Sequence, residues 1–150
     1  MIRPAVEADV PELIAMIREL AEFEQLADQV VIGEDDLADA LFGPNAVVRD
    51  AVVDDGNGGL AGHALWYRTF STFLGKTGIW LEDLYVRPAH RRRGHARALL
   101  DHLRGLTDGR LEWEVLEWNA PAIDFYQRLG ARPVAGWDHY RWYEDGSIRT

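Results

Sequence analysis

The hydrophobic period of this sequence changes near residue 46, and that change limits the possible folds more than any other feature. Before it, apolar residues from Val10 to Leu20 recur at the i, i+3, i+4, i+7 spacing of one buried helical face. After it, the stretches 46–53, 60–70 and 78–86 have the composition of strands. Their connections are short, and the first is rich in Asp, Asn and Gly. We therefore expect helices first and then an antiparallel meander of three strands.

The rest of the chain alternates between helical and strand patterns. The full set of expected elements is a short edge strand over 2–5, helices over about 8–25 and 34–42, the three meander strands, a helix over about 93–106, a strand over 111–118, a helix from Asn119 through Leu129 with Gly130 as C-cap, and one or two final strands including 139–143. This order joins antiparallel pairing to a central β-α-β unit. It predicts an α+β domain with a twisted, mostly antiparallel sheet and helices on both faces.

Length and composition narrow the class of protein. The chain has 150 residues, which predicts a single domain over 1–150, and its 47% hydrophobic content is that of a folded protein. A net charge of −9 disfavours nucleic-acid binding, which needs a basic field. The apolar stretches are far shorter than the roughly 20 residues of a membrane span. The sequence has no cysteine, and we expect a cytoplasmic protein with no metal site and no membrane or nucleic-acid partner.

One segment departs from the acidic average. Arginines and histidines are concentrated between Arg87 and Arg104, around the pattern Arg91-x-x-Gly94-x-Ala96. Because this pattern lies between a predicted strand and a predicted helix, free backbone N–H groups at the helix start could bind a diphosphate. The same letters also fit a solvated helix terminus. The loop lacks the Gly-Lys-Ser/Thr of a Walker loop and the three glycines of a dinucleotide fingerprint.

Two flanking motifs make the loop specific. Leu81-Glu82-Asp83-Leu84-Tyr85-Val86 precedes it, and Glu117-Trp118-Asn119 with Phe125-Tyr126 follows it. Over nearly its whole length the sequence resembles the GNAT superfamily of N-acetyltransferases, and within it most resembles the diamine (spermidine/spermine) N1-acetyltransferase family. The closer resemblance rests on these motifs together with 19–24, 29–30 and 75–76.

The resemblance implies direct transfer of an acetyl group from acetyl-CoA, as co-substrate, to a primary amine. In that family pattern Tyr126 would be the general acid that faces the coenzyme sulfur, and Glu82 would take the amine proton, directly or through water. The implied cofactor-binding residues are Leu84, Tyr85 and Val86, whose backbone would meet the pantetheine arm and the thioester, then Arg91, Arg92, Arg93, Gly94, His95, Ala96 and Arg97, and Asn119 and Ala122.

Structural roles for the same residues remain open from spacing alone. Tyr126 shares a helical face with Phe125 and Leu129, as a core residue would. Glu82 could be a paired structural carboxylate, and Asn119 is a sufficient helix N-cap without any ligand.

The acceptor is expected to be a small cationic amine, a diamine, a polyamine or a lysine-like amino acid. Candidate substrate-binding residues are Phe23, Glu24, Glu82, Asp83, Glu112, Trp113 and Glu114, because carboxylates beside aromatic rings suit an ammonium group. The sequence departs from the polyamine pattern at 133–137 and at Phe73, which leaves room for a shorter amine such as a lysine-like amino acid or its thioether analogue. A homodimer is expected from the family. Protein or peptide acetylation and non-catalytic acyl-CoA binding are the alternatives.

Overall fold

The computed structural model describes residues 1–143 of the 150. The chain falls into two compact units, Met1–Trp113 and Glu114–Thr150, and each is described by itself. The first unit contains the sheet, and the second contains one helix and the segment that follows it.

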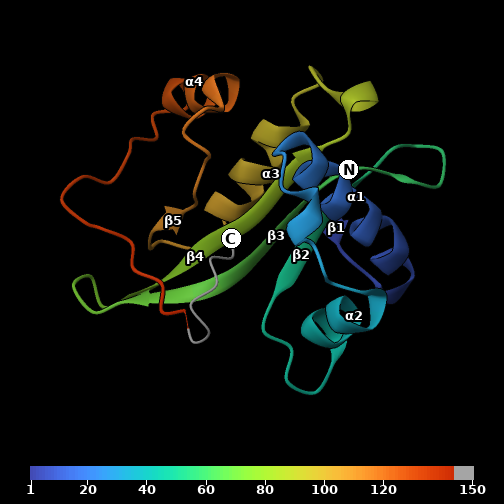
Figure 1. The fold of residues 1–150 in the computed structure, drawn as a ribbon, viewed down its shortest axis with the longest axis horizontal. Coiled ribbons are helices and arrows are strands. Elements are labelled where there is room, and N and C mark those ends of the chain that lie inside the picture. Colours follow the sequence, from blue (N-terminus) through green and yellow to red (C-terminus); the bar gives the residue numbers. More distant parts are fainter. Residues whose placement is uncertain (144–150) are drawn as a thin grey trace. The chain divides into compact units, whose positions relative to one another are not determined.

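A five-stranded sheet forms the centre of the first unit (Figure 1). Its order β1-β2-β3-β4-β5 follows the chain, with antiparallel pairing up to β4 and parallel pairing between β4 and β5. The strands are β1 (Ile2–Pro4), β2 (Arg49–Asp54), β3 (Leu60–Ser71), β4 (Lys76–Val86) and β5 (Leu111–Glu112). The predicted meander and the β-α-β unit are therefore confirmed, and the β3–β4 loop is shorter than expected because pairing continues to Ser71↔Lys76.

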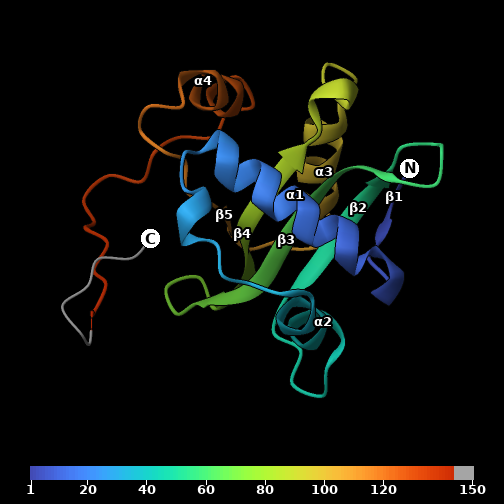
Figure 2. The same ribbon diagram turned by 45° about the vertical axis from the view of Figure 1, so that its right-hand side comes forward.

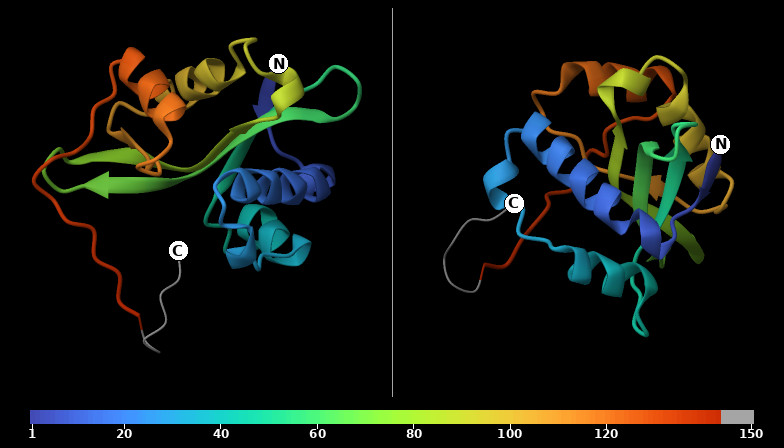
Figure 3. Two further views of the ribbon diagram at one scale, coloured as in Figure 1. Left: turned by 45° about the horizontal axis from the view of Figure 1, so that its top comes forward. Right: turned by 90° about the vertical axis from the view of Figure 1, so that its right-hand side faces the viewer.

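Helices cover both faces of the sheet. The right-hand view of Figure 3 shows α1 (Val10–Phe23) and α2 (Glu34–Phe42) on one face and α3 (His95–Arg104) on the other. In Figure 2, α1 lies across the strands. Apolar residues of the first two helices form one buried cluster with the facing strand residues: Val10, Leu13, Ile14, Met16, Leu37, Val52, Leu60, Leu65 and Tyr85. Short 3-10 turns lie at Glu7–Asp9, Ala27–Gln29 and Pro88–His90.

The helix predicted over about 93–106 starts later and ends earlier than expected. Arg92 and Gly94 both have positive φ, 61° and 80°, and a right-handed helix cannot include that conformation. The helix therefore begins at His95, just after the loop.

A β-bulge interrupts the pairing of β3 with β4. Leu65 pairs with Asp83 and Trp66 pairs with Leu81, so Glu82 is the extra residue that opposes no single partner. Bulges re-aim side chains and increase local twist. As a result, Asp83 lies on the sheet face that carries Leu65 and packs under α1.

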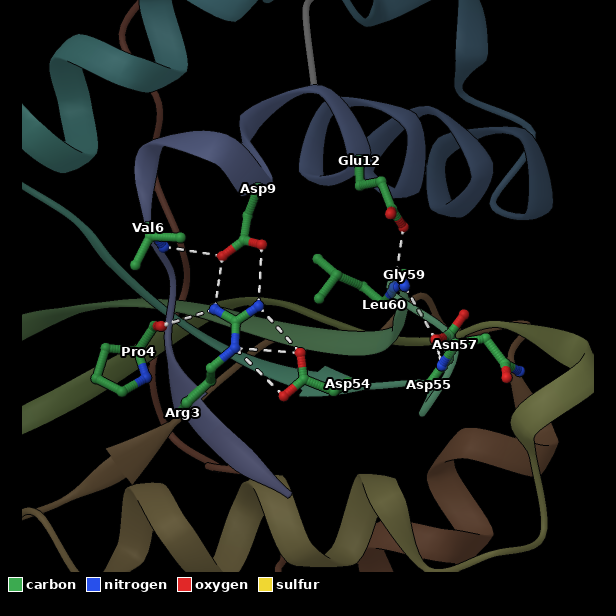
Figure 4. Close-up of polar contacts among 10 residues, drawn as sticks. All are labelled: Arg3, Pro4, Val6, Asp9, Glu12, Asp54, Asp55, Asn57, Gly59 and Leu60. Carbon is green, nitrogen blue, oxygen red and sulfur yellow. Dashed lines mark hydrogen bonds and ion pairs between the residues drawn. The ribbon is translucent and has the colours of Figure 1, made fainter.

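An arginine ties the first 3-10 turn to the sheet (Figure 4). The Arg3 guanidinium donates to both oxygens of Asp9, at 2.8 and 3.0 Å, and its Nε donates to Asp54 at 3.1 Å. The same Asp9 carboxylate accepts from the Val6 backbone N–H at 2.8 Å. These bonds fix the chain where it enters α1, and in the same view Glu12 of α1 accepts from the Leu60 N–H at 3.0 Å.

In the second unit, α4 (Ala120–Arg128) has the predicted ends. The Asn119 side chain accepts from the Ala122 N–H at 3.4 Å as N-cap, and Gly130 follows the helix with φ 94°. The last of the predicted strands is wrong, because 131–143 contains no strand. A strand needs a neighbour to accept its backbone hydrogen bonds, and Tyr140 and Trp142 are each 89% exposed.

The predicted strand over 111–118 is also mostly wrong. Only Leu111 and Glu112 pair with β4, opposite Ile79 and Trp80. The pairing stops at Trp80, two residues before the bulge at Glu82. Within the first unit, the end of β4 therefore pairs with β3 alone.

Candidate active site

The start of α3 presents unpaired backbone donors. The first intrahelical bond runs from the Ala98 N–H to the Gly94 carbonyl at 2.9 Å. The N–H groups of His95, Ala96 and Arg97 therefore precede any helical partner and point out of the helix. A Cβ built on Gly94 would meet no described atom within 4 Å, so an anion can approach this backbone closely. The geometry fits a diphosphate, as the sequence predicts.

Some arginines near this loop are bonded to other parts of the fold. Arg87 bonds Glu12 at 2.7 Å and Glu19 at 3.1 Å, and so fastens the end of β4 to α1. Arg97 bonds Asp101 at 3.0 Å on its own helix, and Arg104 donates to the Gly109 carbonyl at 3.0 Å. The basic segment is therefore partly structural. Arg92 and Arg93 are exposed at the loop itself.

Arg91 is exposed but contacts the end of β4. Its Nε donates to the Val86 carbonyl at 2.9 Å. Its guanidinium lies 5.9 Å from the ring centroid of Phe23 and 5.7 Å from that of Tyr85. This contact joins the last residue of α1 to the strand that precedes the loop.

His95 reports the positive field at the start of α3. Burial, together with nearby cations that include Arg93 and His90, lowers the pKa of His95. A site in which cations repel one another has free energy to gain from binding an anion.

The exposed edge of β4 supplies a second set of backbone groups. Pairing with β5 ends at Trp80, so Leu81–Val86 pairs with β3 alone. Along this edge, alternate residues direct their N–H and C=O groups away from β3. An extended arm such as pantetheine can bind there as an added strand. Leu84, Tyr85 and Val86, the predicted thioester and pantetheine contacts, all lie on this edge.

Carboxylates gather next to that edge. Glu82, at the bulge, is exposed and accepts from the Trp80 Nε1–H at 2.9 Å. Burial raises the pKa of Asp83, and the Glu82 and Asp50 carboxylates raise it further, against the effect of His63. Burial also raises the pKa of Glu24, and the charge of Asp83 adds to it. These groups form a cluster that attracts a cation and resists full ionisation without one.

Phe23 completes this part of the site. It ends α1, is 48% exposed, and precedes Glu24 directly. The first unit therefore brings together four of the predicted substrate residues: Phe23, Glu24, Glu82 and Asp83. Glu112 pairs with Trp80, and Trp113 ends this unit.

The remaining predicted residues belong to the second unit. Tyr126 is half-buried on α4, with its ring 5.6 Å from that of Phe125. Asn119 and Ala122 form the N-cap described above. Glu114 lies 3.7 Å from His139 Nδ1. For these residues the catalytic, cofactor and substrate roles stay predictions.

Sequence reasoning missed one buried pair in the first unit. Asp50 of β2 and His63 of β3 have fully buried side chains joined by a hydrogen bond of 2.8 Å between Oδ2 and Nδ1. Burial raises the pKa of Asp50, and the Asp50 carboxylate raises the pKa of His63 against the effect of burial. The available signal was an Asp and a His next to the apolar runs 51–53 and 64–66.

The described residues lack two other kinds of feature. Within residues 1–143, no helix is both long and apolar enough to span a bilayer. The same residues hold no cluster of His, Asp and Glu side chains suited to a metal ion.

Comparison with known proteins agrees with this geometry. A sequence model of the acetyltransferase (GNAT) family matches residues 14–131. A thialysine N-epsilon-acetyltransferase from Sus scrofa is 36% identical over 165 residues, covering 99% of this chain and 95% of that protein. An L-ornithine N5-acetyltransferase, NATA1, from Arabidopsis thaliana is 28% identical over 184 residues, covering 91% and 81%. In fold, an integron cassette protein from the mobile metagenome of V. cholerae is similar, with a TM-score of 0.78, 23% identity, and coverage of 97% and 93%.

Proposed function

Because the chain belongs to the acetyltransferase (GNAT) family, we propose that this acyltransferase moves the acetyl group of acetyl-CoA to a primary amine of a small cationic substrate. The observation that carries the proposal is the group of carboxylates, Glu24, Glu82 and Asp83, beside the open edge of β4. An acyl carrier on that edge would have its reacting end next to groups that attract an ammonium ion.

The acceptor we favour is a lysine-like amino acid or its thioether analogue. Similar proteins are described as acting on thialysine and on L-ornithine, both short amines with a terminal amino group. The sequence departures at 133–137 and Phe73 also fit a substrate shorter than a polyamine. Diamines and polyamines remain candidates in the same class.

The ammonium nitrogen loses one proton before attack and a second as the amide forms, while the leaving sulfur gains one, so one proton is released overall. The neutral amine nitrogen attacks the thioester carbon, the C–N bond forms and the C–S bond breaks. In our proposal Glu82, directly or through water, takes the proton that the amine must lose. Backbone N–H groups of Leu84–Val86 would stabilise the negative charge on the carbonyl oxygen, and Tyr126 would protonate the leaving thiolate.

The loop and helix would hold the donor. Backbone N–H groups of His95, Ala96 and Arg97 suit the diphosphate, with Arg92 and Arg93 as charged contacts. Acetyl-CoA supplies the activated acetyl group, and the residues of this chain bind and orient it. Asn119 and Ala122 are proposed contacts at the start of α4.

Substitution of the proposed acid tests the mechanism. Tyr126→Phe removes only the hydroxyl, so turnover should fall about 100-fold, the lower range for loss of a general acid, while acetyl-CoA affinity stays within about twofold. Tyr67→Phe on β3 removes one tyrosine hydroxyl outside the proposed catalytic groups and is the matched control. Full activity in Tyr126→Phe would remove this tyrosine from the mechanism.

A thiol-release assay tests the acceptor. Thialysine, lysine, ornithine, diamines, spermidine, aminoglycosides and short peptides would each be offered with acetyl-CoA. We expect the highest kcat/KM with the lysine-like amino acids. Peptides as the best substrates would favour protein acetylation, and tight acetyl-CoA binding without release against any amine would favour a binding module.

We also propose that the protein is a cytoplasmic homodimer. Trp137, Tyr140 and Trp142 are 75%, 89% and 89% exposed, which is unusual for large aromatic side chains unless a surface covers them. A second copy is the occupant we favour. Light scattering after size exclusion should give twice the 17.0 kDa chain mass, and Trp142→Ser should shift the equilibrium toward monomer. A monomeric parent protein would refute this proposal.

A further inference from the structure

The buried pair of Asp50 and His63 has a polar atom left over. Both side chains are 0% exposed, and their single mutual hydrogen bond is 2.8 Å. His63 Nε2 is buried without a hydrogen-bond partner among the described residues, whereas the Asp50 carboxylate also interacts with the Ala64 backbone N–H. An unpartnered buried polar atom costs free energy, so a histidine with only a structural role would be expected to satisfy this nitrogen.

The sheet register directs the pair toward the substrate carboxylates. His63 pairs with Tyr85 and Leu65 pairs with Asp83, so His63 and Asp83 are diagonal neighbours on one face of β3 and β4. Cβ atoms in such diagonal pairs are about 7–8 Å apart or slightly less, close enough for the charge of the imidazole to act on the Asp83 carboxyl group. Without the bulge at Glu82, Asp83 would point to the opposite face.

The carboxylates around Asp83 oppose its ionisation, so a positive charge on His63 would favour the ionised form of Asp83. Carboxylates approach it from three sides: Asp50 on β2, Glu82 on β4 and Glu24 at the end of α1. Together with burial they favour the protonated, uncharged acid, which cannot pair with an ammonium ion. Among the groups that act on Asp83, His63 is the one that favours ionisation.

The other charged groups near His63 do not supply a free positive charge to Asp83. Arg87 acts on His63 from the end of β4, but its guanidinium is bonded to Glu12 and Glu19 of α1. Asp9, at the start of α1, acts on Asp50 but is itself paired with Arg3. The imidazole therefore has Asp50 on one side, Asp83 on the other, and Arg87 engaged elsewhere.

We propose that His63, held by Asp50, is a positioning residue that keeps a positive charge behind Asp83 and so maintains Asp83 as the ionised partner of the cationic amine. This inference rests on the proposed function for the role of Asp83. His63 itself has no exposed atom and does not touch the substrate. Its effect is on amine binding and on the pH dependence of that binding.

The first test needs no activity. Imidazole ¹⁵N shifts of the protein without substrate, followed from pH 5 to 9 and assigned with His63→Gln, report the charge of His63 directly. We expect the imidazolium at pH 7, and a fall of about one unit or more in its pKa when Asp83→Asn removes the neighbouring negative charge. A neutral His63 at pH 7, or a titration unchanged by Asp83→Asn, would overturn the inference whether or not the protein acetylates amines.

The second test is kinetic, with the acceptor that the thiol-release assay identifies. His63→Gln removes the cation. If that single variant does not fold, the double variant Asp50→Asn with His63→Gln replaces it. The double variant also removes the buried carboxylate and keeps a hydrogen-bonded pair. For His63→Gln, amine KM should rise about tenfold at pH 6.5, as expected for a one-unit shift at Asp83, and approach the parent value toward pH 9. The double variant also removes the Asp50 charge, which acts on Asp83 in the opposite sense, so its rise should be smaller but have the same pH dependence.

Acetyl-CoA KM should stay within about twofold in both variants, and His102→Gln on α3 controls for the loss of a histidine. A change in amine KM that is equal at every pH, or a loss confined to kcat, would assign His63 a purely structural role and refute the inference. If no amine is acetylated, the proposed function fails while the NMR result still decides the charge of His63.

Discussion

Substituting Gly94 by alanine separates backbone strain from coenzyme binding. Gly94 has φ 80° at the start of α3, and an added Cβ would meet no described atom within 4 Å. Gly56, in the turn between β2 and β3, has φ 84° and equally open space. The two positions thus share their conformation and lack of clash and differ in location.

The stability cost should be the same for both variants. An L-residue in the left-handed region costs about 1–2 kcal/mol, and the less flexible unfolded chain offsets about 0.4–1 kcal/mol of it. We expect a net loss of about 1 kcal/mol, or a fall in Tm of about 2–4 °C for a chain of this size. Only Gly94→Ala should affect the donor. A Cβ that holds a diphosphate oxygen away from the backbone removes a charge-assisted hydrogen bond, about 1.5–3 kcal/mol, or roughly 10- to 150-fold in affinity.

Calorimetric titration with acetyl-CoA and thermal unfolding of the apo protein measure the two effects separately. The expected result is a matched fall in Tm with weakened acetyl-CoA binding in Gly94→Ala alone. Parent-like affinity in Gly94→Ala would mean that the diphosphate does not approach this backbone. An equal loss of affinity in Gly56→Ala would mean that the effect is general destabilisation, and either result would refute the argument from the loop.

Three further predictions concern other parts of the first unit. Hydrogen bonds from Arg3 hold the pKa of Asp9 below its usual value. A depressed carboxyl pKa stabilises the fold above the unfolded pKa of about 4, and this stabilisation is lost as pH falls through the folded pKa. The Tm of the parent should therefore drop more between pH 5 and 3 than that of Asp9→Asn, and parallel curves would contradict this. A Cβ on Gly109 would lie 2.3 Å from the Thr77 carbonyl oxygen, whereas one on Gly105 would have its nearest neighbour at 3.4 Å. In urea unfolding, Gly109→Ala should therefore lower the free energy of unfolding by about 3 kcal/mol, and Gly105→Ala should lower it much less. Equal urea midpoints for the two variants would disprove the close approach. The lowered pKa of His95 should rise when acetyl-CoA brings negative charge to the loop. Acetyl-CoA affinity should therefore increase as pH falls through that pKa. An NMR titration of His95 that is the same with and without acetyl-CoA would exclude this coupling.

Local signals predicted most of the elements well. The bounds expected for α2, 34–42, match Glu34–Phe42, because its first turn carries its own cap: the Asp36 carboxylate accepts from the Gly33 N–H at 2.9 Å. Asn119 and Gly130 likewise bounded α4 from within the sequence. Elements whose ends depend on pairing with a distant strand were predicted poorly, as the short β5 and the absent strand over 139–143 show.

The loop at 91–96 was likewise predictable only in part. Its helix start could be predicted, because free N–H groups follow from helix geometry alone. The roles of its arginines could not be predicted from their number in the sequence. Arg87 looks like Arg92 and Arg93 in the sequence, yet it bonds two glutamates of α1 that lie 68 and 75 residues away.

The substrate carboxylates depend on a feature that no local pattern reveals. If the pairing continued without interruption from Trp66↔Leu81, Asp83 would oppose Ala64 and lie on the face opposite Leu65. The extra residue at Glu82 instead puts Asp83 on the face of Leu65, with Glu24 and His63 as electrostatic neighbours. A single shift in register therefore decides whether a buried histidine can act on the carboxylate that would receive the amine. Because the bulge arises from the pairing of β3 with β4, the Asp50–His63 pair acquires its proposed function only in the folded sheet.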